Sequence, residues 1–231
     1  MTVAKPTVPS PKISAGTVTS PVECRALADG VYMVPVDDDL VILDLRADAY
    51  ACLPHAAAAV RIDGATVEAD LGLLGLMTET GLVHDAQPRH GRTPPALPGR
   101  CVEPRSGWTS ILAAAYMLIA HFRIHHLGSG PTVQALIKAL PSRPAKCADA
   151  ARAAAVTAAF IRLMPWAPRQ GACLHRAFLL LSMLRRAGVD AVWVFGVRTW
   201  PFAAHCWLQM GDAVLDDDPE RVSQYAPIMA V

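Results

Sequence analysis

Apolar side chains recur with a helical period after Cys173, and they predict the most clearly marked helix of the chain. They stand at the i, i+3, i+4, i+7 spacing of a helix buried along one side: Leu174, Ala177, Phe178, Leu181 and Leu184. Arg185, Arg186 and Gly188 would end the helix, with two cations in its last turn and a glycine that tolerates a left-handed conformation. Cys173 would therefore lie at the first turn, where the helix dipole and unpaired backbone N–H groups favour a thiolate over a thiol.

Three strands are predicted after this helix, from alternating apolar and β-branched residues: 192–197, 203–209 and 213–217. If the turn between the last two strands is centred on Gly211, His205 lies opposite Asp217, with their Cβ atoms about 5 Å apart on one face. A carboxylate there could hold the imidazole in one tautomer while the other ring nitrogen faces the Cys173 thiolate. These are the parts of a cysteine hydrolase or acyl transferase.

Two neighbouring carboxylates compete with Asp217 for this position. A two-residue turn at 211–212 would bring Asp218 opposite His205 instead, and Asp216 lies next to both in the chain. The strand pattern alone leaves the choice open.

Residues 21–85 have the pattern of a small separate domain. Three strands are predicted there: Val31 to Val36, Leu40 to Leu45 and Ala49 to Leu53. Short helices are predicted after them: one begun by Pro54 and continued from His55 to Val60, one capped by Thr66 with an apolar stripe at Leu71, Leu74 and Met77, and one at 78–85. Strands followed by short helices are typical of a small α+β domain of winged-helix type.

Proline marks the segments on either side of this domain. Residues 1–20 are rich in Pro, Ser and Thr and are expected to be disordered. Residues 86–106 are so dense in proline that they are expected to form a linker without helix or strand. A second domain, 107–231, would follow the linker.

The second domain opens with helices. Residues 108–124 are predicted to form a buried core helix, because their uninterrupted apolar run, 111–120, is much shorter than the roughly 20 residues that span a bilayer. Further helices are predicted at 131–140 and 148–163. With the strands described above, this gives an α+β domain of helices packed on an antiparallel sheet.

Several motifs of the second domain coincide in order with those of a known family. They are Cys173-Leu174-x-Arg176, a helix end at Leu184 to Gly188, Phe195-Gly196-Val197-Arg198, Pro201-Phe202-x-Ala204-His205-x-Trp207 and Asp217. In this order they resemble the transglutaminase-like B protein of lasso-peptide maturation. The resemblance runs over roughly 107–231 and departs from the family at Cys206, where a small alanine is usual.

The resemblance implies a papain/transglutaminase-like cysteine-protease domain. Cys173, His205 and Asp217 would then form the catalytic triad of a peptidase that removes the leader from a ribosomally made lasso-peptide precursor, a step of antibiotic biosynthesis. It also implies a partner, an asparagine-synthetase-like cyclase that uses ATP and closes the freed N-terminus onto a side-chain carboxylate. The protease itself would need no cofactor.

The first domain resembles, less specifically, the PqqD-like precursor-recognition element of that family. In that family the leader peptide pairs, as an added strand, with the third strand of the element and lies against its last helix. The last helix here is 78–85. The corresponding third-strand residues are Ala49, Tyr50, Ala51, Cys52 and Leu53. An open strand edge offers backbone hydrogen bonds to such a peptide. The alternative is an ordinary edge strand that binds nothing, since strand periodicity does not reveal which edge is open.

Composition excludes other classes. The chain has 21 Lys and Arg against 20 Asp and Glu, so it offers no electrostatic argument for binding nucleic acid or an anionic membrane. Pro6, Pro9 and Pro11 interrupt the start, which has no apolar signal-peptide core, and a cytoplasmic protein is expected. The six cysteines show no CxxC pairing, which agrees with a reducing compartment and argues against structural zinc.

Gln170 and His175 lie close to Cys173 in the chain and have possible roles of their own. Gln170, three residues before Cys173, could donate its amide to an oxyanion together with the Cys173 backbone N–H. His175 would point away from Cys173 on the same helix, towards the surface or the substrate. A zinc site made of Cys173, His175, His205 and Cys206 is disfavoured, because the adjacent residues His205 and Cys206 point to opposite faces of a strand.

The sequence thus predicts a two-domain cysteine leader peptidase. Two rivals stay open. One is a transglutaminase-fold acyl transferase or amidase, which needs the same three residues and differs in the acceptor. The other is a non-catalytic peptide-binding adaptor whose triad is vestigial.

Overall fold

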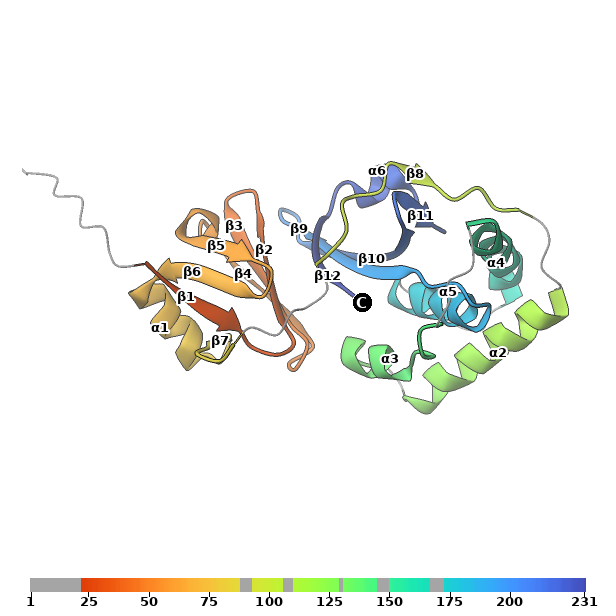
Figure 1. The fold of residues 1–231 in the computed structure, drawn as a ribbon, viewed down its shortest axis with the longest axis horizontal. Helices are drawn as coiled ribbons and strands as arrows, with labels where there is room; N and C mark the ends of the chain where they lie inside the picture. The colour runs from red at the N-terminus through yellow and green to blue at the C-terminus, as the bar shows by residue number, and fades with distance from the viewer. Residues whose placement is uncertain (1–21, 88–92, 106–109, 129–130, 145–149, 167–172) are drawn as a thin grey trace, which may run out of the picture.

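The computed structural model describes residues 22–87, 93–105, 110–128, 131–144, 150–166 and 173–231 (Figure 1). The expectations for residues 1–20 and for Gln170 lie outside these ranges. The chain forms two parts, one built mainly from strands before residue 88 and one in which helices cover a sheet.

Two antiparallel sheets form the N-terminal part. Strands β5 (Val60–Asp63), β6 (Thr66–Asp70), β1 (Val22–Leu27) and β7 (Val83–His84) lie in that order in the first sheet. Strands β2 (Val31–Val36), β3 (Asp39–Asp44) and β4 (Ala49–Leu53) form the second. The three strands of this second sheet are the ones that the hydrophobic pattern predicts, and β4 lies at its edge. A core that includes Leu40, Val67 and Met77 joins the sheets to helix α1 (Leu71–Glu79).

One of the helices predicted in this part is confirmed, because the stripe of Leu71, Leu74 and Met77 lies on α1 with the last two residues buried. The other predictions are wrong. Residues 55–60 form only a 3-10 turn, η1 (Ala57–Ala59). Thr66 begins strand β6 rather than capping a helix, and the N-cap of α1 is Asp70, whose carboxylate accepts from the backbone N–H of Gly72 at 2.8 Å. Instead of a last helix, residues 78–85 hold the end of α1 and strand β7. This strand-rich arrangement does not confirm a winged-helix type.

The C-terminal part combines a five-stranded sheet with a group of helices, of which α5 (Cys173–Arg186) packs on the sheet. The sheet order is β12 (Ala226–Ala230), β9 (Val192–Arg198), β10 (Ala203–Met210), β11 (Ala213–Leu215) and β8 (Arg100–Cys101). The helices are α2 (Ser110–His126), α3 (Val133–Ala139), α4 (Ala150–Leu163) and α5 (Cys173–Arg186), with η2 (Met164–Trp166) after α4 and a short α6 (Pro219–Val222) before β12. Helix α5 lies between α2, α4 and strand β10, and its start at Cys173 confirms the predicted helix (Figure 1).

The expectation that 86–106 is a linker without regular structure is wrong in part. Arg100–Cys101 forms β8, which pairs in parallel with β11. The Gln209 side-chain amide donates to the Ala96 carbonyl at 2.7 Å, and the backbone N–H of Gly99 donates to the Asp212 carbonyl. The residues between the prolines therefore keep enough free backbone groups to extend the five-stranded sheet by one short strand.

Helix α2 is not the fully buried core helix that its composition predicts. Ala113, Met117, Ala120 and Ile124 face the core, whereas Ile111, Leu118 and Phe122 are exposed, Ile111 to 86%. None of the described helices is long and apolar enough to cross a membrane. The apolar run is thus a helix with one face in the core and large apolar side chains on its exposed face.

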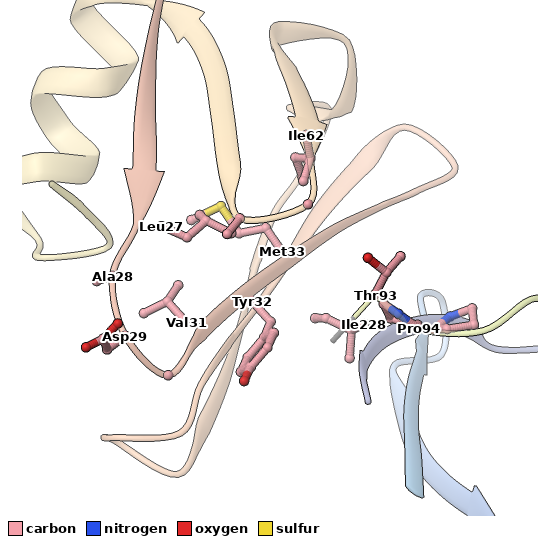
Figure 2. Close-up of a pocket in the computed structure, with 14 residues that line it drawn as sticks. Leu27, Ala28, Asp29, Val31, Tyr32, Met33, Ile62, Thr93, Pro94 and Ile228 are labelled. Atoms are coloured by element: carbon pink, nitrogen blue, oxygen red, sulfur yellow. The ribbon is translucent and has the colours of Figure 1, made fainter. Parts of the chain in front are cut away.

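The two parts meet along β2 and β12. Ile228 of β12 lies close to Tyr32 of β2 and to Pro94, beside a cavity of about 290 Å³ (Figure 2). The sequence pattern does not predict strand β12. The strand is short and contains Pro227, so no clear alternation of apolar and polar side chains marks it.

Gly196 of β9 leaves room for the aromatic side chains that cover the sheet. A Cβ atom there would lie 2.8 Å from the Trp207 ring and 2.9 Å from the Tyr225 Cβ atom. We expect Gly196→Ala to lower the free energy of unfolding by about 1–3 kcal/mol through overpacking, as measured by denaturant titration. Gly75→Ala in α1, where a Cβ atom meets nothing within 4 Å, should be neutral or stabilising. Equal effects of the two substitutions would contradict this packing argument.

Candidate active site

A cavity of about 670 Å³ opens between helix α5 and strand β10. Cys173, the first residue of α5, lines it together with His205 from β10 and Asp217 from the turn after β11. The structure therefore brings the three residues of the predicted triad to one cavity.

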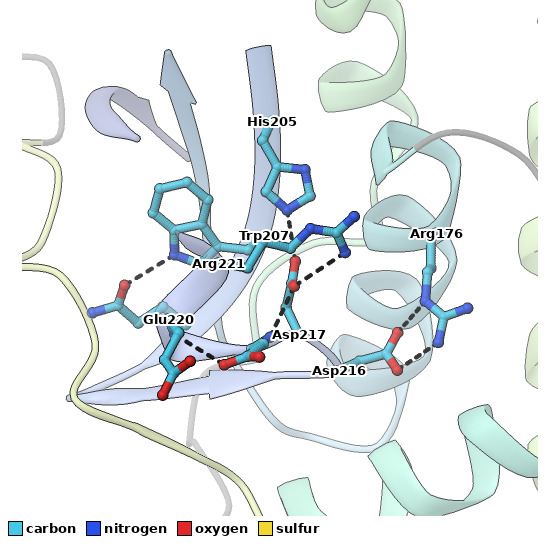
Figure 3. A network of polar contacts seen from close by, with 9 residues as sticks. Arg176, His205, Trp207, Asp216, Asp217, Glu220 and Arg221 are labelled. Carbon is cyan, nitrogen blue, oxygen red and sulfur yellow. Dashed lines mark hydrogen bonds and ion pairs between the residues drawn. The ribbon is translucent and has the colours of Figure 1, made fainter. Parts of the chain in front are cut away.

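His205 connects the other two members. Its Nε2 atom lies 2.7 Å from the Asp217 Oδ2 atom, and both side chains are largely buried (Figure 3). This bond leaves Nδ1 for Cys173, whose side chain is hydrogen-bonded to that of His205. The arrangement is a nucleophile, a base and a group that orients the base.

Asp217 reaches His205 by a different path from the predicted one. The β10–β11 turn is the two-residue turn at 211–212, since Met210 pairs with Ala213 and Leu208 with Leu215. Continued, this register would place residue 218 opposite His205. The strand ends at Leu215, however, and Asp216 adopts a left-handed conformation with φ 59° that redirects the chain. The predicted cross-strand pairing of His205 with Asp217 is therefore wrong, although the two side chains meet.

The two rival carboxylates have other partners. Asp218 caps α6, where it accepts from the Glu220 backbone N–H at 2.9 Å. Asp216 accepts two hydrogen bonds from the Arg176 guanidinium, at 2.5 and 2.6 Å, and is itself largely buried (Figure 3). Because Arg176 is one helical turn after Cys173, this ion pair joins the turn that carries Asp217 to the helix that carries the thiol.

The early end of β11 also gives the thiol access to the backbone of β10. Strand β11 pairs with β10 only at residues 208–210, whereas β9 pairs along 203–209. The other edge of β10 is thus free of strand pairing near Cys206, and the Cys206 backbone N–H donates to the Cys173 sulfur. Both His205 and Cys206 contact that sulfur, although they are neighbours on one strand.

These contacts favour a thiolate on Cys173. A hydrogen bond from the Cys206 thiol, and further ones from His205 and the Cys206 backbone, lower the pKa of Cys173 to about 4 against the opposing effect of burial. The neighbouring sulfur and burial raise the pKa of Cys206 well above its usual range, so Cys206 stays protonated and donates. The one departure from the family pattern thus contributes a hydrogen bond to the predicted nucleophile.

His205 is held in its charged form. Its hydrogen bonds with Asp217 and Cys173 raise its pKa to about 9, although burial opposes this. Burial also opposes the ionisation of Asp217, but hydrogen bonds from His205 and from the Asp218 backbone N–H lower the pKa of that carboxyl overall. Between pH values of about 4 and 9 the site therefore holds a thiolate, an imidazolium and a carboxylate.

Aromatic side chains cover the His205 ring. Trp207 is buried with its ring centre 6.2 Å from that of His205, and Tyr225 lies at 5.2 Å. The Trp207 indole N–H donates to Gln209 rather than to the triad (Figure 3). These rings exclude water from one side of the His205–Asp217 bond, which strengthens it.

The surroundings of the triad differ in part from what the sequence predicts. His175 faces helix α2 instead of the surface, with its ring centre 5.9 Å from that of His121. No group of three His, Cys, Asp or Glu side chains in the described ranges is arranged to hold a metal ion. Burial and the nearby Cys206 and Cys173 raise the pKa of Tyr50 in β4 to about 12. No pattern in the sequence indicates this approach of the N-terminal part.

Comparison with known proteins gives a family match to this region and a partial match to one relative. Residues 116–230 match the Transglutaminase-like superfamily. The matched residues are thus similar to transglutaminase-like domains, and they include Cys173, His205 and Asp217. A stretch of 59 residues is 40% identical to the microcin J25-processing protein McjB of Escherichia coli; it makes up 26% of this chain and spans only 28% of the length of that protein. No solved structure matches the chain.

The low pKa of Cys173 predicts alkylation that hardly changes with pH. With iodoacetamide, the rate at Cys173 should be nearly constant above a pH of about 5, because the thiolate is already formed. His205→Ala should shift the onset of alkylation to higher pH, since it removes a hydrogen bond and a positive charge. Mass spectrometry of digested protein measures each cysteine separately, with the exposed Cys24 and Cys101 as internal controls. A Cys173 profile that follows those two would contradict the thiolate.

The Arg176–Asp216 ion pair is expected to support the position of Asp217. Arg176→Ala should lower the free energy of unfolding by about 1–3 kcal/mol, because it leaves a buried carboxylate without its partner. It should also lower the pKa of His205, measured by NMR titration, as Asp217 moves away. Arg221→Ala is the matched control, since that guanidinium lies 3.7 Å from Asp217 but is mostly exposed. An unchanged His205 pKa in Arg176→Ala would contradict this positioning role.

Proposed function

We propose that this protein is a cysteine peptidase of lasso-peptide biosynthesis that removes the leader from a ribosomally made precursor. The observation that carries the proposal is the placement of Cys173, His205 and Asp217 around one cavity, with Cys173 at a helix start. The transglutaminase-like domain and the partial similarity to a microcin J25-processing protein support the choice of substrate class.

The proposed reaction uses the charged groups that the site already holds. The Cys173 thiolate attacks the carbonyl carbon at the junction of leader and core, and the His205 imidazolium gives its Nδ1 proton to the departing amine. Asp217 keeps the ring oriented through Nε2. A water molecule, deprotonated by His205, then hydrolyses the thioester and releases the leader as a carboxylate. The Cys173 backbone N–H, with Gln170 as a further candidate, would bind the oxyanion.

The N-terminal part is proposed to bind the leader. Strand β4, with Ala49, Tyr50, Ala51, Cys52 and Leu53, is the last strand of its sheet, and such an edge can accept a peptide as an added strand. An asparagine-synthetase-like cyclase that uses ATP is the proposed partner for ring closure. The peptidase step itself needs no cofactor in this mechanism.

The test is to incubate the protein with the precursor peptide encoded beside its gene and to follow the products by mass. The wild type should release intact leader, with or without the cyclase. Cys173→Ala should release none, and Asp217→Asn should cut about 10²–10⁴-fold more slowly, because the imidazole loses its orientation. Arg221→Ala serves as a nearby control and should stay close to wild type. Leader release by Cys173→Ala would exclude Cys173 as the nucleophile.

The same experiment separates the rival functions. With a primary amine added, an acyl transferase would give a leader whose mass is increased by the amine, whereas a peptidase gives the free acid. Binding of the precursor without any turnover, even with the cyclase present, would indicate an adaptor. Both rivals remain compatible with a transglutaminase-like domain.

A further inference from the structure

A small apolar pocket lies where strand β4 meets the closed end of the β9–β10 hairpin. It has a volume of about 120 Å³ and is lined by three residues from each side: Tyr50, Ala51 and Cys52, and Thr199, Trp200 and Phe202. This is well below the roughly 300–1,000 Å³ of pockets for drug-sized ligands, so it suits one side chain rather than a whole small molecule. Each domain supplies one wall.

The hairpin end is fixed on the N-terminal domain. The Trp200 indole N–H donates to the Asp39 Oδ2 atom at 2.6 Å, and the other oxygen of this buried carboxylate accepts from the His55 backbone N–H. Phe202 packs against Tyr50 with ring centres 5.6 Å apart. In Figure 1 the closed end of the hairpin reaches the sheet that contains β2 and β3. The walls of the pocket are therefore preorganised.

Two features indicate that this pocket meets a ligand. Trp200 and Phe202 remain 75% and 48% exposed, and Trp200 has a left-handed backbone with φ 42°, a conformation rare for an aromatic residue. Exposed aromatic rings beside a hollow are the usual anchors of peptide and protein interfaces. Beside them, in the part of the chain that the structure describes, β4 has no strand partner beyond β3.

The pocket lies along the same hairpin as the catalytic cavity, although the two share no lining residue. Phe202 precedes His205 by three residues on the same hairpin, a distance of about 10 Å in extended chain. Tyr50, in the opposite wall, packs against the same apolar core as Cys173, a core that includes the buried Cys206. A peptide that runs along β4 towards Cys173 therefore passes this pocket about three residues before the reacting carbonyl.

We propose that this pocket binds an apolar side chain of the substrate peptide, three or four residues before the bond that is cut. The inference rests on the proposed function and adds a specificity site that both domains build. The occupant is an extended peptide, because the free edge of β4 supplies backbone hydrogen bonds and the pocket supplies apolar contact. The choice of cleavage site then depends on the N-terminal domain as well as on the triad.

The first test measures binding without catalysis. A yeast-displayed library of random 20-residue peptides is selected for binding to the full-length Cys173→Ala protein. Selected peptides should share an apolar residue, and its replacement by aspartate should weaken binding about tenfold or more. Ala51→Glu, which places a charge in the pocket wall, should weaken binding by a similar factor. The two changes together should cost no more than either alone, because they remove the same contact.

A matched substitution controls for the added charge. Ala47→Glu adds the same charge at an exposed position in the turn before β4, outside both the strand and the pocket, so it should change affinity by less than about threefold. Phe202→Ala provides a second way to remove a wall, and thermal unfolding checks that each variant is folded. Selected peptides without a common apolar residue, no selected peptides, or equal effects at Ala47 and Ala51 would overturn the proposal.

The second test adds catalysis. Selected peptides are incubated with the protein that retains Cys173, and the cut position is read by mass. Cleavage three or four residues after the apolar side chain supports the pocket, and cleavage at an unrelated distance overturns it. Peptides that bind through the pocket but are never cut would instead overturn the peptidase function and leave the binding site in place.

Discussion

The active site depends on the contact between the Cys173 sulfur and an unpaired stretch of strand β10. Because β11 pairs only with residues 208–210, the backbone N–H of Cys206 points to the start of helix α5 instead of to another strand. The sulfur there receives that N–H, the Cys206 thiol and the His205 imidazole. A longer β11 would use this edge for sheet pairing and would leave the thiol without its strongest donors.

The same short strand also frees Asp217. The left-handed Asp216 redirects the chain, and the Arg176–Asp216 ion pair holds the redirected turn against the helix that carries Cys173. Gly196 lies directly across from His205 and leaves space for Trp207 and Tyr225 over the imidazole. The charges of the site are thus maintained by residues outside the predicted triad, several of which also line its cavity, and each of them acts on orientation or on water access.

The sequence was most informative where a pattern is local. The start of α5 at Cys173 and the strands β2, β3, β4, β9 and β10 follow from periodicity over a few residues. The region of the β10–β11 turn shows the limit, because whether a strand continues past Leu215 is decided by the buried Arg176–Asp216 pair, forty residues apart in the chain. Thr66 was misplaced for a related reason. Its pairing with Ala26 of β1, a long-range contact, outweighs its local preference for a helix cap.

Two further features could not be read from composition. Strand β8 forms among prolines because the neighbouring β11 offers free backbone groups, which only the folded sheet reveals. The approach of Tyr50 to Cys173 depends on how the two domains meet. The motif Cys173-Leu174-x-Arg176 does place Arg176 one helical turn after the thiol, which is one half of the ion pair. Its partner Asp216 lies in a turn, whereas the sequence pattern predicts a strand there.

The buried Asp39 carboxylate has a consequence for how the chain unfolds. One of its oxygens is satisfied within the N-terminal part by His55, and the other by Trp200 of the β9–β10 hairpin. Separating the two parts would break the second of these hydrogen bonds, at a cost of about 1–3 kcal/mol. The stability of each part therefore depends partly on this contact. Local opening of the β9–β10 hairpin is coupled to the integrity of the β2-β3-β4 sheet, which contains none of the three triad residues.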